Sequence, residues 1–187
     1  MTNIYEHAVF ENDGFANGVD HEYSDCTFVH CDFSNKQFYD ARFENCKFDA
    51  CNFSMAKFSG TIFNRVQFRK CKIIGVDFAK CSRMAFSVDF EETILDYTLF
   101  QKNNLKSFMF KDCRLQGTNF IEANLTDAKF IRCDLEKAVF ERSNLEKANF
   151  TSSWNYSINP ETNKLKKTKF SLPHVVGLLG NLDIIIE

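Results

Sequence analysis

The sequence predicts an all-β solenoid, a chain wound into stacked four-sided coils, followed by a short C-terminal helix and strand. Three observations predict this fold class: an aromatic or leucine residue at almost every fifth position, strict Phe/Leu alternation in the second half of the repeat, and a small residue two positions before most of them, with Lys36, Asn103 and Phe108 as exceptions. A helix repeats every 3.6 residues and a strand every 2.0, so a period of five fits neither element. A chain that turns a corner after each pentad would place one apolar side chain per side in a shared interior.

The period-five positions define the expected core. They run from Phe28 to Phe78, and after a gap they resume at Phe90 and alternate Phe with Leu as far as Phe150. If coils stack like on like, a Phe/Leu alternation that repeats every two pentads requires an even number of sides, and four sides of one pentad each satisfy it. One ladder of rings in the core would then include Phe28, Phe48, Phe68, Phe110, Phe130 and Phe150.

The repeat divides the chain into three predicted segments. Residues 1–150 form the β-helix, with frame slips near 16–22 and 79–89; residues 151–170 form a connector, and residues 171–187 a helix and strand. Phe90 comes two positions later than two whole repeats after Phe78 would place it, which indicates an insertion. Within it Arg83, Met84 and Phe86 leave the frame, either as a structural bulge or as residues that project toward a partner.

The cysteines share one position in the repeat. Seven of the eight fall two residues before a central residue, in the slot that elsewhere holds mostly Ala, Thr, Val or Ser, and Cys81 keeps the same spacing into the interruption. A free cysteine packs as a small apolar residue. Neither the C-x-x-C spacing of zinc sites nor a secretory context accompanies them. We therefore expect packing in preference to metal binding or disulfides.

Composition and motifs argue against several classes of function. The net charge is -2, with 10 acidic and 4 basic residues in 1–60, 6 and 10 in 61–120, and 9 and 9 in 121–187. The sequence shows no phosphate-binding glycine loop, no G-x-S-x-G and no zinc signature, so we expect no enzyme activity, no cofactor and no metal. The start lacks the features of a signal peptide, and no stretch reaches transmembrane length, so a cytoplasmic protein is expected. The lysines at 164, 166, 167 and 169 are expected to solubilise the connector rather than bind phosphate.

The C-terminal segment predicts a helix capped by Ser171 and Gly180, with Pro173 in its first turn. Its apolar residues exceed what the end of one coil would cover, which favours a homodimer interface over a monomeric cap. A strand is expected over Leu182, Ile184, Ile185 and Ile186. The residues predicted to form the dimer interface are Leu172, Val175, Val176, Leu178, Leu179, Leu182, Ile184 and Ile186.

The runs NCKFDACNF, GTNFIEANLTDAKF and DLEKAVFERSNLEKANF match the A(D/N)LXX consensus. Over about residues 5–150 the chain resembles pentapeptide-repeat proteins, which implies a right-handed quadrilateral β-helix. Within that family it is similar to the Qnr, MfpA and McbG group of fluoroquinolone- and microcin-resistance proteins that bind DNA gyrase. The narrower resemblance rests on overall length, on the interruption after CKIIGVDF, and on the tail WNYSINPETNKLKKTKF followed by SLPHVVGLLGNLDIIIE.

This resemblance implies a non-enzymatic DNA mimic, a homodimer that binds DNA gyrase or topoisomerase IV and protects it from quinolones. The acidic residues offered to such a partner include Glu44 and Asp49, with no direct contact to nucleic acid and no membrane association. Two other modes of action stay open. The protein would dock through the interruption at Arg83, Met84 and Phe86, or it would be a scaffold for an unrelated protein, without topoisomerase activity.

Overall fold

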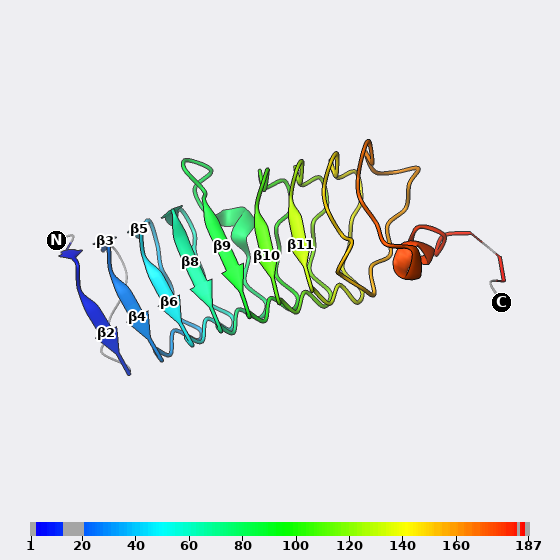
Figure 1. Ribbon diagram of the computed structural model, residues 1–187. Helices are drawn as coiled ribbons and strands as arrows, with labels where there is room; N and C mark the ends of the chain where they lie inside the picture. Colours follow the sequence, from blue (N-terminus) through cyan, green and yellow to red (C-terminus); the bar gives the residue numbers. More distant parts are fainter. Residues whose placement is uncertain (1–2, 13–20, 183, 186–187) are drawn as a thin grey trace.

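The computed structural model describes residues 3–12, 21–182 and 184–185. In this part the chain forms a right-handed quadrilateral β-helix with one short helix at its C-terminal end, and the two termini lie at opposite ends of the rod (Figure 1). The solenoid fold class predicted from the period of five is confirmed, apart from the C-terminal strand treated below.

Two parallel sheets form two of the four sides. One sheet contains β1 (Ile4–Glu6), β3 (Glu22–Ser24), β5 (Arg42–Glu44) and β7 (Ile62–Asn64). The other contains β2 (Val9–Glu11), β4 (Thr27–Val29), β6 (Lys47–Asp49), β8 (Val66–Arg69), β9 (Val88–Glu91), β10 (Met109–Lys111) and β11 (Lys129–Ile131). The remaining sides are joined by single parallel bridges such as Asp32 with Asn52 and Leu99 with Asn119. The strands are short because each pentad ends in a corner.

The strand register shows how much of the chain makes one coil. Phe28 pairs with Phe48 and Phe43 with Phe63, so each coil takes four pentads. The step changes at the two frame slips. The pair of Val9 with Thr27 is two positions shorter than four pentads, and the pair of Val66 with Val88 is two positions longer. The strands thus stay in register across both irregularities, and at the second one the extra residues leave the coil as a loop.

Aromatic rings stack in columns along the axis. Phe48 stacks on Phe28 at 4.5 Å between ring centroids and beneath Phe68 at 5.0 Å. Phe68 stacks on Phe90 at 5.4 Å, so the column crosses the insertion. The same column continues through the rings at 110, 130, 150 and 170. Such rings form a continuous buried core rather than a hollow tube.

Most corners are formed by non-glycine residues in the left-handed backbone region, two positions after the central residue. Asn35 has φ 58° and Lys102 has φ 60°. This conformation is uncommon outside glycine, but here each corner N–H donates to the carbonyl of the following coil: Asn35 to Ser54 at 2.9 Å and Lys102 to Ile121 at 3.0 Å. Gly117 is a corner where a side chain would not fit, because a Cβ would lie 2.7 Å from the ring of Tyr97.

Residues 151–170 form a further coil, so the predicted connector is wrong. Asn149 pairs with Lys169, and Phe170 stacks on Phe150 at 5.5 Å. Polar residues occupy the inward slot of this coil. The Asn163 amide donates to the Phe140 carbonyl at 2.9 Å, so this polar group is satisfied inside the coil.

The C-terminal segment contains a 3-10 helix, η2 (Leu172–Leu178), with Pro173 near its start. Ser171 is the N-cap residue but its side chain makes no capping bond, and the C-cap is Leu179 rather than Gly180. The predicted strand is wrong for the described residues Leu182, Ile184 and Ile185, which form no strand. A strand requires a hydrogen-bonded neighbour, and this end of the chain extends past the last coil (Figure 1). Ile186, also assigned to the strand and to the dimer interface, lies outside the described residues.

Candidate functional site: surfaces of the rod

The interior of the described chain is packed with apolar side chains and thiols. All eight cysteines are free and buried, and no group of His, Cys, Asp and Glu among the described residues is arranged to hold a metal ion. Burial raises the pKa of Cys46 to about 12, and its thiol donates to the Tyr23 carbonyl at 3.4 Å. A protonated thiol is a poor nucleophile. The buried thiols pack in the core, and those of Cys46 and Cys71 also donate to backbone carbonyls of the preceding coil.

The acidic residues expected to meet a partner are paired with arginines of the next coil. Glu44 accepts from Arg65 at 3.0 Å, and Asp49 lies 3.3 Å from Arg69. These pairs are partly exposed, so each contributes little to stability, but each removes a free negative charge. Glu44 and Asp49 thus present much less negative charge than their sequence suggests.

The ladder of ion pairs continues along the side that carries β9, β10 and β11. Lys111 pairs with Glu91, and Arg132 pairs with Asp112 at 2.6 Å. The hydrogen bond from Lys111 lowers the pKa of Glu91, and that from Arg132 lowers the pKa of Asp112. This side of the rod therefore alternates in charge from coil to coil.

A more buried ion pair lies on the adjacent side. The side chain of Asp96 is only 6% exposed, and Arg114 donates to both of its oxygens through Nε, at 2.9 and 3.1 Å. The backbone N–H of Gln116 donates to the same carboxylate at 3.2 Å. Both carboxylate oxygens therefore accept hydrogen bonds, and the pair joins two neighbouring coils.

The interruption forms a loop that follows the 3-10 helix η1 (Phe78–Lys80). Arg83 and Met84 are exposed, Met84 by 71%. Phe86 instead packs inward: it contacts Phe63 edge to face at 6.4 Å and stacks on Phe108 at 5.7 Å. Of the three residues that leave the frame, two project from the rod and Phe86 fills its interior.

Beside this loop lies a cleft of about 180 Å³, lined by Arg83, Phe86, Lys102, Asn103 and Asn104. Asn103 occupies the inward slot and is 5% exposed. Its amide donates to the Phe78 carbonyl at 3.3 Å, while its Oδ1 is buried without a partner in the described part of the chain. The cleft therefore combines two cations, an aromatic ring and an unsatisfied acceptor.

The C-terminal segment displays an apolar surface. Leu172 is 88% exposed and Ile185 is 89% exposed, with Val176, Leu179, Leu182 and Ile184 also open to solvent. Two of the predicted interface residues, Val175 and Leu178, are partly buried, and Leu178 packs against the core. One face of the segment thus covers the last coil and the other is uncovered.

The helix η2 is attached to the rod at Gly177. Its carbonyl accepts from the Ile158 N–H at 2.9 Å, and a Cβ at Gly177 would lie 2.1 Å from the Tyr156 carbonyl oxygen. A larger residue at this position would push the helix off the coil.

The profile described as pentapeptide repeat region matches residues 22–86 and 84–154. The chain belongs to the pentapeptide-repeat family. Among curated proteins no significant match was found. No helix in the described part of this pentapeptide-repeat protein is both long and apolar enough to cross a membrane.

Solved structures with a similar fold are pentapeptide-repeat proteins. A trypsin-treated variant of QnrB1, a plasmid-mediated fluoroquinolone resistance protein, is 18% identical, with a TM-score of 0.58 over 100% of this chain and 98% of that one. Full-length QnrB1 is 20% identical, with a TM-score of 0.40 over 97% and 100% of the two chains. HetL of the cyanobacterium Nostoc, involved in heterocyst differentiation regulation, is 14% identical, with a TM-score of 0.43 over 91% and 87%. At these identities the likeness concerns the fold.

Proposed function

We propose that this pentapeptide-repeat protein is a non-enzymatic rod that binds DNA gyrase or topoisomerase IV and protects it from quinolone-type inhibitors. The observation that carries the proposal is the fold match to trypsin-treated QnrB1, which extends over the whole chain rather than over a few coils. A rod of this kind would act through its shape and its surface.

DNA mimicry alone is a weak account of how the rod would bind. A mimic needs free negative charge along its length, whereas Glu44 and Asp49 are both paired with arginines. We therefore place the decisive contact at the interruption, where Arg83 and Met84 project beside the cleft that contains Asn103. A partner side chain with an apolar part would contact Met84 and cover the exposed part of Phe86.

The experiment is a gyrase supercoiling assay with ciprofloxacin, with and without the protein. We expect added protein to restore supercoiling, and we expect Met84→Ser combined with Arg83→Ser to lose this rescue. Met55→Ser is the matched control, because Met55 is an exposed methionine at a different corner. The absence of rescue by the unaltered protein at micromolar concentration would refute the topoisomerase proposal.

A homodimer through the C-terminal segment is part of the proposal. The uncovered apolar face of η2 and the residues after it support it, because a dimer would remove Leu172, Val176 and Leu179 from water. Light scattering should give the mass of two chains, and Val176→Asp with Leu179→Asp should reduce it to one. A wild-type mass of one chain would instead identify the segment as a cap.

The second candidate function is a scaffold for an unrelated protein. The pairing of Glu44 and Asp49 favours it, since a rod with few free acidic groups is not specialised to occupy a DNA-binding site. In that case the loop variants would leave topoisomerase assays unchanged, while Val176→Asp with Leu179→Asp would still reduce the mass measured by light scattering.

A further inference from the structure

We propose that the last coils carry a binding surface for the phosphate backbone of nucleic acid. The surface, termed here the lysine ridge, runs along one corner of the rod and the side next to it. Every lysine in it is exposed, and within the described residues none takes part in an ion pair. Its members are Lys106, Lys129, Lys147, Lys164, Lys166, Lys167 and Lys169.

The fold holds these lysines in an ordered array. The lysines of residues 164–169 belong to a coil rather than to a loose connector, because the N–H of Lys164 donates to Ser143 at 3.0 Å and that of Lys169 to Ala148 at 2.8 Å. Lys147 and Lys167 are equivalent left-handed corners, with φ 59° and 60°. Adjacent coils are separated by roughly 4.8 Å. Ordered backbone lowers the entropy lost when the ammonium groups bind a charged partner.

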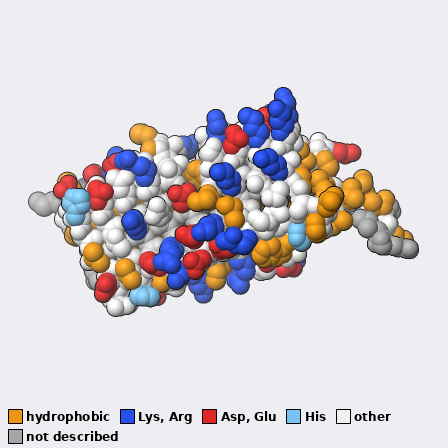
Figure 2. Space-filling model, in the orientation of Figure 1, with side chains coloured by type: hydrophobic (Ala, Val, Ile, Leu, Met, Phe, Trp, Pro, Cys, Tyr) orange, Lys and Arg blue, Asp and Glu red, His pale blue; other side chains and the backbone are white. Residues whose placement is uncertain are grey.

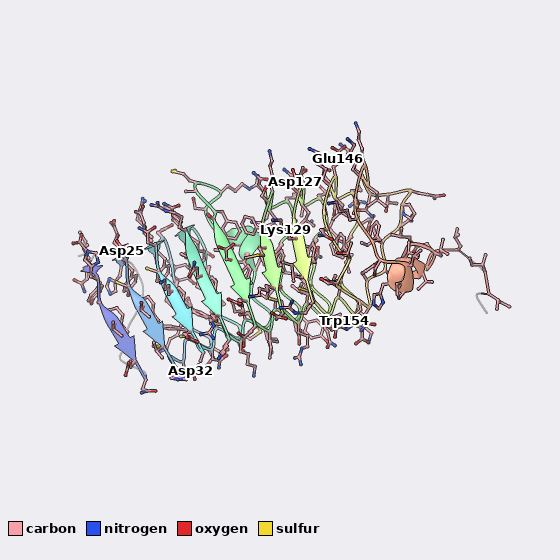
Figure 3. The ribbon with its side chains drawn as sticks, viewed as in Figure 1. Asp25, Asp32, Asp127, Lys129, Glu146 and Trp154 are labelled. Carbon is pink, nitrogen blue, oxygen red and sulfur yellow. The ribbon has the colours of Figure 1, made fainter. Side chains whose placement is uncertain are left out.

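The ridge lysines differ from the arginines of the same part of the rod. The arginines of residues 101–150 are all ion-paired, whereas the ridge lysines of the described chain are not. Two carboxylates, Asp127 and Glu146, lie among the ridge lysines at this edge of the rod (Figure 3). They are outnumbered by the lysines, and Figure 2 shows Lys and Arg gathered along this edge of the C-terminal half. The ridge therefore keeps an excess of positive charge.

The chemistry of the ridge fits a phosphate backbone better than a folded protein. Protein interfaces depend on a few buried aromatic or arginine anchors, but the positions between the lysines include small polar residues such as Ser107, Thr126 and Asn149. Lysine binds phosphate as a point charge without demanding a fixed geometry. The binding energy would come from release of counterions, which requires only that several ammonium groups lie along one line of phosphates.

The test is fluorescence anisotropy of a labelled duplex DNA of mixed sequence, titrated with the full chain. If about four lysines contact phosphates, raising salt from about 50 to about 200 mM should weaken binding roughly a hundredfold. Lys166→Gln, Lys167→Gln and Lys169→Gln together should lower the slope of log affinity against log salt by roughly 0.9 for each lysine lost, and should weaken binding more than tenfold at low salt.

The matched control replaces the exposed Lys36, Lys47 and Lys57 of the N-terminal coils by Gln. It changes net charge by the same amount, so it should bind DNA as the unaltered protein does. Circular dichroism verifies that both variants keep the fold. Equal losses in the two variants would overturn the proposal by showing a general charge effect. Absence of DNA binding by the unaltered protein at low salt would overturn the proposal as well. So would a ridge variant that binds DNA as before and loses only a salt-dependent self-association measured without DNA.

Discussion

The coils from Phe28 to Phe78 and those from Phe90 to Phe150 fill the same four-sided cross-section in two ways. In the first block almost every central residue is Phe, and Phe48 meets Phe43 and Phe53 edge to face at 5.4 and 5.1 Å. In the second block two opposite sides carry Phe and the other two Leu. There the rings still stack along the axis, but edge-to-face contacts are longer, near 6.0 Å for Phe100 with Phe110.

The side chains in the inward slot also differ between the two blocks. In the first block the slot often holds a thiol, as in Cys46, which donates to the Tyr23 carbonyl at 3.4 Å. In the second block hydroxyls are frequent, and Ser143 donates to the Phe120 carbonyl at 2.7 Å. Both donors thus reach a carbonyl of the preceding coil. The slot therefore accepts small side chains, many of which can donate to that coil, and cysteine is the more apolar choice where four rings meet.

The largest effect expected from this comparison is the loss of a stacked ring. Phe48→Ala should lower the free energy of unfolding by about 3–5 kcal/mol, because the ring is buried between two stacked neighbours and leaves a cavity. Leu115→Ala in the second block should cost somewhat less, about 2–4 kcal/mol. Urea unfolding measures both. A loss below about 2 kcal/mol for Phe48→Ala would mean that the coil collapses around the gap.

The next effect separates the two kinds of slot. Ser143→Ala should destabilise by about 1 kcal/mol, because it removes one hydrogen bond to the buried Phe120 carbonyl, which keeps its bond from the Ala123 N–H. Cys46→Ala should cost less, about 0.5 kcal/mol, since a thiol is a weak donor. Equal losses in the two variants would show that size alone selects the slot residue.

The thiols of the first block predict a decline of stability at alkaline pH. Cys46 has an ordinary pKa of 9.0 and burial raises it to about 12 in the fold, so between these values the unfolded chain has lost the proton that the native chain keeps. The contribution of this group to stability is complete below pH 9 and falls as pH rises, by roughly 1 kcal/mol at about pH 10. In urea unfolding, Cys46→Ala should lessen the decline by that amount. A pH profile of stability that is the same in Cys46→Ala as in the unaltered protein would contradict this prediction.

The smallest effect concerns the ion pairs that join coils. Arg69→Ala should change the free energy of unfolding by no more than about 1 kcal/mol, because its pair with Asp49 is exposed. It should nevertheless make the surface near β6 more acidic. If DNA mimicry governs binding, this variant would protect gyrase better than the unaltered protein; if docking at the loop governs it, protection should stay the same.

The strength of each sequence pattern decides how much of the fold and of the surface can be predicted from the sequence. The period of five and the Phe/Leu alternation predict the sides, the stacking and the buried cysteines, since one residue type recurs in each slot. The coil over 151–170 was not predictable because its step is irregular: Phe140 bridges Ile158, two positions short of a full coil, before Leu165 and Phe170 resume the frame. Glu44 and Asp49 each pair with an arginine about one coil further along the chain, so the four-pentad coil already suggests these pairs.

Two features of the sequence predict that Phe86 packs against the core. Phe108 is too large for the inward slot, and a frame break precedes it by one coil. Together these features indicate that an extra ring has entered the core, which is where Phe86 lies. The C-terminal strand could not be judged from the sequence, because pairing depends on a neighbour that the apolar pattern of Leu182 and Ile184 does not identify.

Binding of this rod to a type II topoisomerase is the most direct test of the proposed function. Sedimentation of the full chain with purified gyrase, with and without duplex DNA, measures this in one experiment. We predict that the chain sediments with gyrase, and that Arg83→Ser with Met84→Ser abolishes this while Met55→Ser does not. A chain that sediments alone at micromolar concentrations of both proteins would contradict the proposed function.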